Sequence, residues 1–239
     1  MPQQQRFLVL RGTQTPFEQF TDYLLTLAPY LIFDGTLTDD KTKIKNRGSG
    51  GATFDGTPTA ITIDANGMNF NGTTSKLNVP NGAGYANQSI TTQVIWFNRV
   101  NGGAGNNGVY WIFASNNNRL LNASATTLAS RRITSATNPQ SVSTTSFANG
   151  VPGILFMEYD DTGDRLIHLY KGLNSAVSEF SYSTNIAATG TLTSESNSLN
   201  IGNDASNALG FNGSMRSWSW INGALTALQK LNLTKFAAV

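Results

Sequence analysis

The sequence contains no cysteine. Disulfide bonds, thiol catalysis and cysteine-based zinc sites are therefore excluded for this chain. His168 is the only histidine. It alternates with Ile167 and Leu169 along an expected strand, so we expect it to face away from them, at a surface or an interface. A Ser-His-Asp triad would also need a sharply presented serine and a buried carboxylate, and nothing marks either one.

Charge is scarce as well, since only 13% of the residues are charged and the formal net charge is +2. This balance is too small to indicate nucleic acid as a partner. Long apolar runs are also missing. The run Phe7 to Leu10 lies between two arginines and is too short for a secretory signal, and no stretch approaches the roughly 20 apolar residues of a membrane span. We therefore expect no membrane partner, and a protein that stays in the compartment where it is made or leaves by cell lysis.

Asparagine, serine, threonine and glycine supply the polarity instead, which is typical of a β protein with many turns. A chain of 239 residues can form one large sandwich that folds without a disulfide or metal. We expect three parts: an N-terminal arm over 1–14, a helix over 15–29 and a single β domain over 30–239. The arm carries a short strand candidate, whose apolar residues are Phe7, Leu8, Val9 and Leu10.

The helix has a complete start signal in Thr15, Pro16 and Glu18, which together form a capping box with proline at the first helical position. Phe17, Phe20, Leu24 and Leu27 then form one apolar stripe. Pro29 is expected to end the helix. We expect the stripe to pack on the sandwich.

From Tyr30 onward short apolar runs alternate with turn signals such as Asn66-Gly67 and Asn212-Gly213. A dense series of short strands of this kind favours a sandwich or barrel. The expected strands are 31–34, 60–63, 68–70, 76–79, 89–99, 109–114, 153–159, 165–170, 176–182, 198–201 and 215–221. A second helical period appears briefly over 224–231.

In the last of these strands strict alternation fails, because Met215 is out of phase with Trp218 and Trp220. One extra residue near Arg216–Ser217 would bring all three side chains to one face. We therefore predict a β-bulge there, with both indoles in the core.

This closing pattern resembles the last strand of the laminin-G-like, concanavalin A-like jelly-roll family, which ends with Phe-x-Gly, apolar residues in this spacing, an Asn turn and Ala-Leu-Ser/Thr. Further matches in the same order are Tyr30–Phe33, Met68–Gly72, Leu77–Pro80, Val94–Phe97, Tyr159–Gly172 and Leu199–Gly202. The resemblance covers roughly residues 15 to 235. It implies an all-β sandwich of two antiparallel sheets, and the single-domain form with an N-terminal helix is similar to lectin-fold proteins of bacteriophages.

Glycan-cleaving members of this family carry Glu-x-Asp-x-x-Glu on one strand. Here Glu158 and Asp160 match the first two carboxylates, but Gly163 stands where the acid/base should be. An Asp-Thr-Gly turn explains Asp160 and Asp161 without catalysis. We therefore expect no enzymatic activity.

Some relatives bind calcium, and aspartates lie in expected turns, but no ordered ligand spacing appears. We expect no cofactor, with calcium left open. The aspartates concerned are Asp34, Asp39, Asp40, Asp160, Asp161, Asp164 and Asp204.

A sugar site needs exposed aromatic rings and amides. The best candidates by composition are Tyr85, Tyr110, Trp111, Asn106, Asn107 and Asn117. The alternative is that Trp111 packs in the core and the asparagines only form turns. The resemblance then leaves three functions: a structural virion component that assembles through its arm with other virion proteins or copies of itself, a glycan-binding lectin, and a glycan hydrolase.

Overall fold

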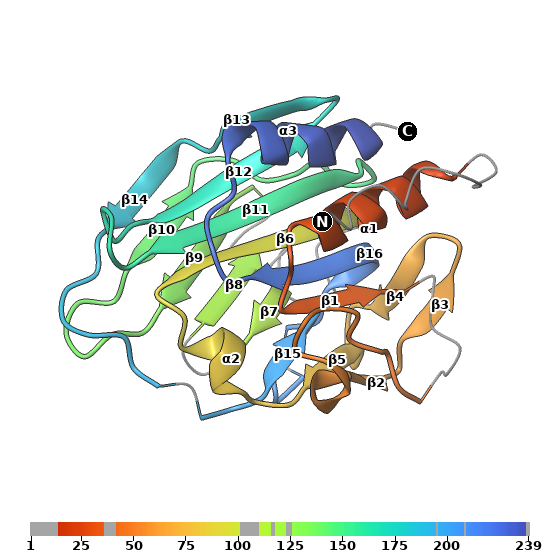
Figure 1. Cartoon of the computed structure of the whole chain (residues 1–239), viewed down its shortest axis with the longest axis horizontal. Coiled ribbons are helices and arrows are strands. Elements are labelled where there is room, and N and C mark those ends of the chain that lie inside the picture. Colours follow the sequence, from red (N-terminus) through yellow and green to blue (C-terminus); the bar gives the residue numbers. More distant parts are fainter. Residues whose placement is uncertain are drawn as a thin grey trace, which may run out of the picture.

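The computed structural model describes residues 14–35, 42–100, 110–115, 118–122, 126–194, 196–207 and 209–237. Within these ranges the chain forms two antiparallel sheets of eight strands each, packed face to face (Figure 1). The expected all-β jelly-roll sandwich is confirmed. The arm residues Phe7, Leu8, Val9 and Leu10 lie outside the described residues.

The first sheet has the order β13-β12-β11-β6-β16-β4-β3, and β1 also pairs with β16. Its strands are β1 Leu31–Asp34, β3 Thr62–Asp64, β4 Gly67–Asn71, β6 Ile90–Arg99, β11 Gly153–Asp160, β12 Ile167–Leu173, β13 Ala176–Glu179 and β16 Asn212–Ile221. The long strands β6 and β16 occupy the middle of this sheet, so neighbours cover them on both sides.

The second sheet has the order β14-β10-β9-β8-β7-β15-β5-β2. Its strands are β2 Thr57–Thr59, β5 Lys76–Val79, β7 Tyr110–Ala114, β8 Asn118–Asn122, β9 Leu128–Arg132, β10 Gln140–Ser143, β14 Tyr182–Ile186 and β15 Leu199–Ile201. Strands β8, β9 and β10 were not predicted. Their buried positions include Ser130, Arg132, Ser141 and Ser143, so they show no apolar alternation.

Helix α1 (Pro16–Thr26) starts as predicted, because Thr15 Oγ1 accepts a hydrogen bond from Glu18 N at 3.3 Å and Glu18 Oε2 accepts one from Thr15 N at 2.8 Å. Its stripe packs on the outer face of the first sheet, where the ring centroid of Phe20 lies 4.7 Å from that of Trp96. The predicted packing of this helix on the sandwich is confirmed.

Helix α3 (Ala227–Phe236) begins with a second capping box, between Thr226 and Gln229. It lies on the same outer face as α1, against β12 and β13 (Figure 1). The helix predicted over 224–231 is present, but it begins and ends a few residues later than predicted. A short helix α2 (Ala83–Ala86) and a 3-10 turn (Ala52–Phe54) complete the helical elements that the structure describes.

The main core lies between the two sheets and closes around the final strand. Trp218 and Trp220 are 0% and 1% exposed. The ladder between β16 and β6 shifts register between Met215 and Ser217, which is the predicted bulge. Both indoles and the Met215 side chain therefore belong to the core, as the sequence indicates. No helix in the described ranges has the length and apolarity needed to cross a membrane.

Candidate functional site

The aromatic residues expected at a sugar site do not form an exposed platform in the described structure. Tyr85 is 1% exposed, its ring centroid lies 5.5 Å from that of Trp220, and its hydroxyl donates to Pro80 O at 2.9 Å. The expectation of an exposed Tyr85 ring is wrong, because this ring fills space in the core beside Trp220. Its hydroxyl donates to a backbone oxygen of the protein itself.

The other sequence candidates belong to, or flank, the hairpin of β7 and β8. The backbones of Tyr110 and Trp111 pair with Asn122 and Leu121, respectively. The side chains of Tyr110 and Trp111 lie outside the described part of the chain, as do Asn106, Asn107 and Asn117. Whether these residues contact a sugar therefore stays a prediction.

Next to this hairpin, the outer face of the second sheet is hollowed by a cleft of about 590 Å³. Strands β5, β15, β7 and β8 contribute to its floor, and the loop after β15 forms part of its wall. Its lining consists mainly of amides, hydroxyls and charged groups: Lys76, Asn78, Ala114, Ser115, Arg119, Asn197, Ser198, Asn200, Asp204, Ala205 and Ser206. We call it the second-sheet cleft. It falls within the usual volume range of ligand sites.

The strand register explains why these side chains meet. Asn78 pairs with Asn200, Asn200 with Ala114, and Ala114 with Arg119. Directly paired residues of antiparallel strands share a face, so one row runs across four strands. Asn78 Nδ2 donates to Asn200 Oδ1 at 2.9 Å, which fixes the two amides side by side.

The row continues beyond the cleft, where Arg119 pairs with Arg131 and Arg131 with Gln140. Burial lowers the pKa of Arg119, and the positive charge of Arg131 lowers it further. The Nε atom of Arg119 is buried and has no hydrogen-bond partner among the described residues. The cleft therefore ends at two adjacent cations.

A smaller cleft of about 430 Å³ lies on the outer face of the first sheet, lined by residues that include Asn69, Asn98, Ser214 and Arg216. Its arginine is already engaged, because the Arg216 guanidinium carbon lies 4.9 Å from the centroid of the Trp96 ring. This cleft provides a comparison for the one on the second sheet.

The carboxylates that resemble a hydrolase motif hold the fold together. Glu158 Oε2 accepts from Lys230 Nζ at 2.5 Å, and Oε1 accepts from Leu225 N at 3.1 Å. Thr92 Oγ1 lies within 3.3 Å of the same Oε1. Glu158 thus connects β11 to the start of α3, and both of its oxygens are occupied.

Asp160 and Asp161 lie in the expected turn. Asp160 Oδ1 accepts from the backbone nitrogens of Thr162 and Gly163 at 2.8 and 3.0 Å. The hydrogen bond from the Thr162 hydroxyl lowers the pKa of Asp160, and these backbone bonds add to the effect. The aspartate therefore stabilises the turn.

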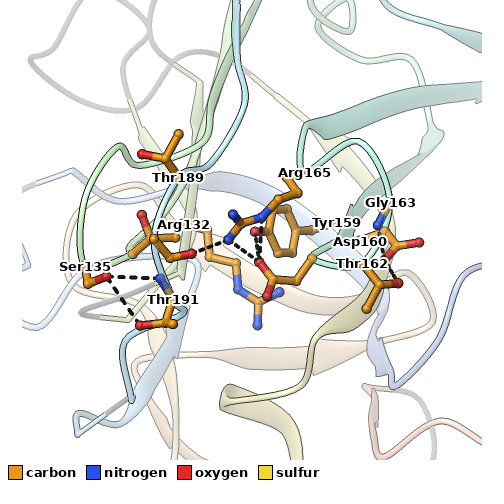
Figure 2. A network of polar contacts seen from close by, with 12 residues as sticks. Arg132, Ser135, Tyr159, Asp160, Thr162, Gly163, Arg165, Thr189 and Thr191 are labelled. Atoms are coloured by element: carbon orange, nitrogen blue, oxygen red, sulfur yellow. Dashed lines mark hydrogen bonds and ion pairs between the residues drawn. The ribbon is translucent and has the colours of Figure 1, made fainter.

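Asp161 accepts hydrogen bonds from both Tyr159 and Arg165. Figure 2 shows the polar network that contains these two residues. The Tyr159 hydroxyl donates to Asp161 Oδ1 at 2.6 Å and Arg165 Nη2 donates to it at 2.8 Å. Burial raises the pKa of Tyr159 to about 12. The phenol therefore stays a proton donor to Asp161 at neutral pH.

Arg132 joins the two sheets within the same network. It comes from β9, and its guanidinium carbon lies 4.7 Å from the centroid of the Tyr159 ring on β11. Arg132 Nη1 donates to Thr91 Oγ1 at 3.2 Å, and Nη2 donates to Gln88 O. Burial lowers the pKa of Arg132 to about 10, so it remains charged near neutral pH. This network therefore links the two sheets of the sandwich.

His168 faces away from the core, as its alternation indicates, and lies between two carboxylates. Its Nε2 is 2.8 Å from Asp164 Oδ2 and its Nδ1 is 2.7 Å from Glu179 Oε1. Within the described residues, no group of three or more histidine, aspartate and glutamate side chains is placed to hold a metal ion.

No protein-family profile matches the chain, and no curated protein matches it in sequence. Solved structures do match its backbone. The binding domain of botulinum neurotoxin DC in complex with SialylT superposes with a TM-score of 0.59 at 9% identity. A structure of botulinum neurotoxin type C, which concerns cell entry dependent upon interaction with two ganglioside molecules, gives 0.62 at 9% identity.

A Trypanosoma rangeli sialidase in complex with sialic acid gives a TM-score of 0.60 at 13% identity. The chain has a lectin-like jelly-roll fold. The three matches cover 87%, 90% and 93% of this chain, in the order given. The chain spans only 51% and 53% of the two neurotoxin structures and 37% of the sialidase. At such low identity these matches establish the fold alone.

Proposed function

We propose that this chain is a non-enzymatic, lectin-fold subunit of a bacteriophage virion, and that its second-sheet cleft contacts glycans on the host surface. The observation that carries the glycan part is the row Asn78–Asn200–Ala114–Arg119 on the floor of that cleft. Amides, hydroxyls and charged groups in one concave site can satisfy the many hydroxyls of a sugar.

The position of the cleft supports the same proposal. Helices α1 and α3 cover the outer face of the first sheet. The short helix α2 places Tyr85 in the core between the two sheets. Neither α1 nor α3 therefore lies between an approaching glycan and the second-sheet cleft.

The matched structures add support of a second kind. The neurotoxin type C structure concerns interaction with gangliosides, and the sialidase structure contains sialic acid. Proteins with this backbone arrangement therefore occur with glycan ligands.

The non-enzymatic part rests on the engaged carboxylates. Glu158 is held by Lys230 and Leu225, and Asp160 closes a turn. Most glycosidases use two carboxyl groups that flank the scissile sugar bond. We expect no release of reducing sugar from any glycan that binds. Release of sugar that is abolished by Glu158→Gln would contradict this.

Glycan binding is tested with an array of surface glycans, followed by calorimetry on the best ligand. Asn78→Ala and Asn200→Ala should each weaken binding about tenfold, because each removes a polar contact and disturbs its paired amide. Asn69→Ala in the smaller cleft is the matched control and should bind like the wild type.

If no glycan binds, or if Asn69→Ala is the only variant that weakens binding, the second-sheet cleft is not a glycan site. Repeating the glycan titration in EDTA and in calcium tests whether binding needs a metal ion. We propose that binding needs no metal, and a loss of affinity in EDTA that calcium restores would overturn this.

The virion part is supported by the resemblance of the closing strands and of the single-domain arrangement to bacteriophage lectin-fold proteins. We propose that the arm assembles the subunit, because the run Phe7 to Leu10 could add a strand to the edge of another chain. Deletion of residues 1–14 should leave a folded domain that no longer joins its particle. Normal assembly of the truncated protein, or purified particles that lack the chain, would contradict this proposal.

A further inference from the structure

Two arginines lie directly opposite one another on the outer face of the second sheet. Arg119 of β8 pairs with Arg131 of β9, and both side chains are half-buried. Like charges at directly opposed positions destabilise a sheet. The fold therefore holds two cations together at a cost unless something else binds them.

The protein does not supply that counter-charge in its described part. Neither guanidinium forms an ion pair with a carboxylate of the residues described. Arg119 also has a buried Nε atom without a hydrogen-bond partner in that part of the chain. A buried donor that lacks an acceptor is costly, and an acceptor from outside would remove the cost.

The surroundings of Arg119 strengthen the positive character of this end. Lys76 lines the same cleft, and its Nζ donates to Ala205 O at 3.1 Å. Asp204 also lines the cleft and accepts a hydrogen bond from the Ser206 hydroxyl at 2.9 Å. The cleft thus combines an excess of positive charge with neutral amides and hydroxyls.

We propose that the ligand of the second-sheet cleft is an acidic glycan, and that Arg119, with Arg131 beside it, binds the acid group. This inference rests on the proposed function, since it names the class of sugar that the cleft takes. A guanidinium presents its donors as a planar fork, which matches a carboxylate or a sulfate through two parallel hydrogen bonds. The amides of Asn78 and Asn200 then contact the neutral part of the glycan.

The test compares sialyllactose, sulfated lactose and lactose, which share a neutral core and differ in the acid group. Binding is measured by calorimetry on the whole chain at low and at high salt. We expect an acidic ligand to bind at least about tenfold more tightly than lactose, since hydrogen bonds to charged groups are the stronger ones. The preference should shrink at high salt, because the site is open to solvent. The two acidic ligands separate a carboxylate site from a sulfate site.

Arg119→Gln should remove most of the preference for the acidic ligand, because it weakens binding of the acidic ligand far more than binding of lactose. Arg131→Gln should reduce the preference less. Arg216→Gln, in the smaller cleft, and Lys235→Gln, exposed on α3, are matched controls for the lost charge and should keep the preference. Thermal unfolding provides a second readout, because relief of the repulsion should leave Arg119→Gln at least as stable as the wild type.

The outcomes separate the two proposals. If lactose binds in the second-sheet cleft as tightly as the acidic ligands, the cleft is a glycan site but the proposed preference for acidic glycans is wrong. If the preference exists and survives Arg119→Gln, the assignment of the arginine is overturned. If none of the glycans binds, the proposed function itself fails. A large loss of preference in Arg119→Gln, a smaller loss in Arg131→Gln and no loss in the two controls, with the Tm preserved, support the inference.

Discussion

The Nζ atom of Lys230 lies 2.5 Å from Oε2 of Glu158, and the two side chains are only 7% and 12% exposed. This pair joins α3 to β11 across the outer face of the first sheet. The same ammonium lies 3.7 Å from the centroid of the Tyr170 ring on β12. One lysine therefore holds the helix to two strands at once.

Lys230→Met should lower the free energy of unfolding by about 3–5 kcal/mol, because it leaves the buried carboxylate of Glu158 without its cation. Denaturant unfolding measures the change. Lys235→Met on the exposed side of the same helix is the control and should shift stability by at most about 0.5 kcal/mol. A double variant with Glu158→Gln should lose less than the sum of the single losses, and strict additivity would show that the pair is not coupled.

Trp218→Ala and Trp220→Ala should each cost about 3–5 kcal/mol, as expected for large buried aromatic side chains. The physical reason is the loss of packing in the core, since both indoles are almost completely buried. Leu228→Ala, at a position that is 64% exposed, is the comparison and should be nearly neutral. Wild-type stability in either tryptophan variant would mean that the core does not close on β16.

Stability should depend on pH through His168. Burial lowers the pKa of His168, but hydrogen bonds and charges from Glu179 and Asp164 outweigh it, so the net pKa is raised above 6.5. The folded state then binds the proton more tightly than the unfolded state does. The resulting stabilisation is complete below pH 6.5 and is lost as the pH rises through the folded-state pKa.

His168→Gln should flatten this part of the pH profile, which unfolding experiments between pH 5 and about 9 can follow. The contribution of the Asp164 carboxylate to stability depends on pH in the opposite way. Burial raises the pKa of Asp164, yet its hydrogen bonds to Leu166 and His168 bring it below the usual value. Its contribution is therefore lost in acid. A wild-type profile in His168→Gln would contradict the role of this cluster.

Gly67→Ala should be more destabilising than Gly150→Ala, although both glycines have positive φ angles, of 102° and 73°. An added Cβ at Gly67 would lie 2.4 Å from Met215 O, at the bulge of β16. At Gly150 it would meet nothing within 4 Å. Gly150→Ala should thus cost only the backbone strain, about 1–2 kcal/mol. Equal losses in thermal unfolding would show that the close approach at the bulge is unimportant.

The sequence was informative where a local pattern carries the structure. The capping box at Thr15 and Glu18 predicts α1, and the phase shift between Met215 and Trp218 predicts the bulge. In both cases neighbouring residues determine the geometry, so no knowledge of distant partners is needed.

Strands β9 and β10 of the second sheet were harder to predict because most of their inward positions are not apolar. Strand β9 buries Ser130 and Arg132, and strand β10 buries Ser141 and Ser143. These side chains find partners across the sandwich: the Ser141 hydroxyl donates to Ile167 O at 2.5 Å, for example. Such pairing depends on residues far away in the chain, so periodicity cannot reveal it.

The candidate site was missed for a related reason. Asn78, Arg119 and Asn200 lie on three separate strands, and only the register of the sheet makes them neighbours. A search for aromatic rings favoured Tyr85, which the core needs for packing. The nearest sequence signal was the asparagine-rich hairpin of β7 and β8, which lies beside the cleft.

The position of β16 has a consequence for how the protein is made. This strand pairs with β1, β4 and β6, all of which precede it in the chain, and it supplies both core indoles. During synthesis, the edges of β4 and β6 that pair with β16 stay unpaired until most of the second half of the chain has left the ribosome. At typical translation rates this interval is on the order of ten seconds. We therefore expect the sandwich to close late, and nascent chains to depend on chaperones that shield those edges until β16 arrives.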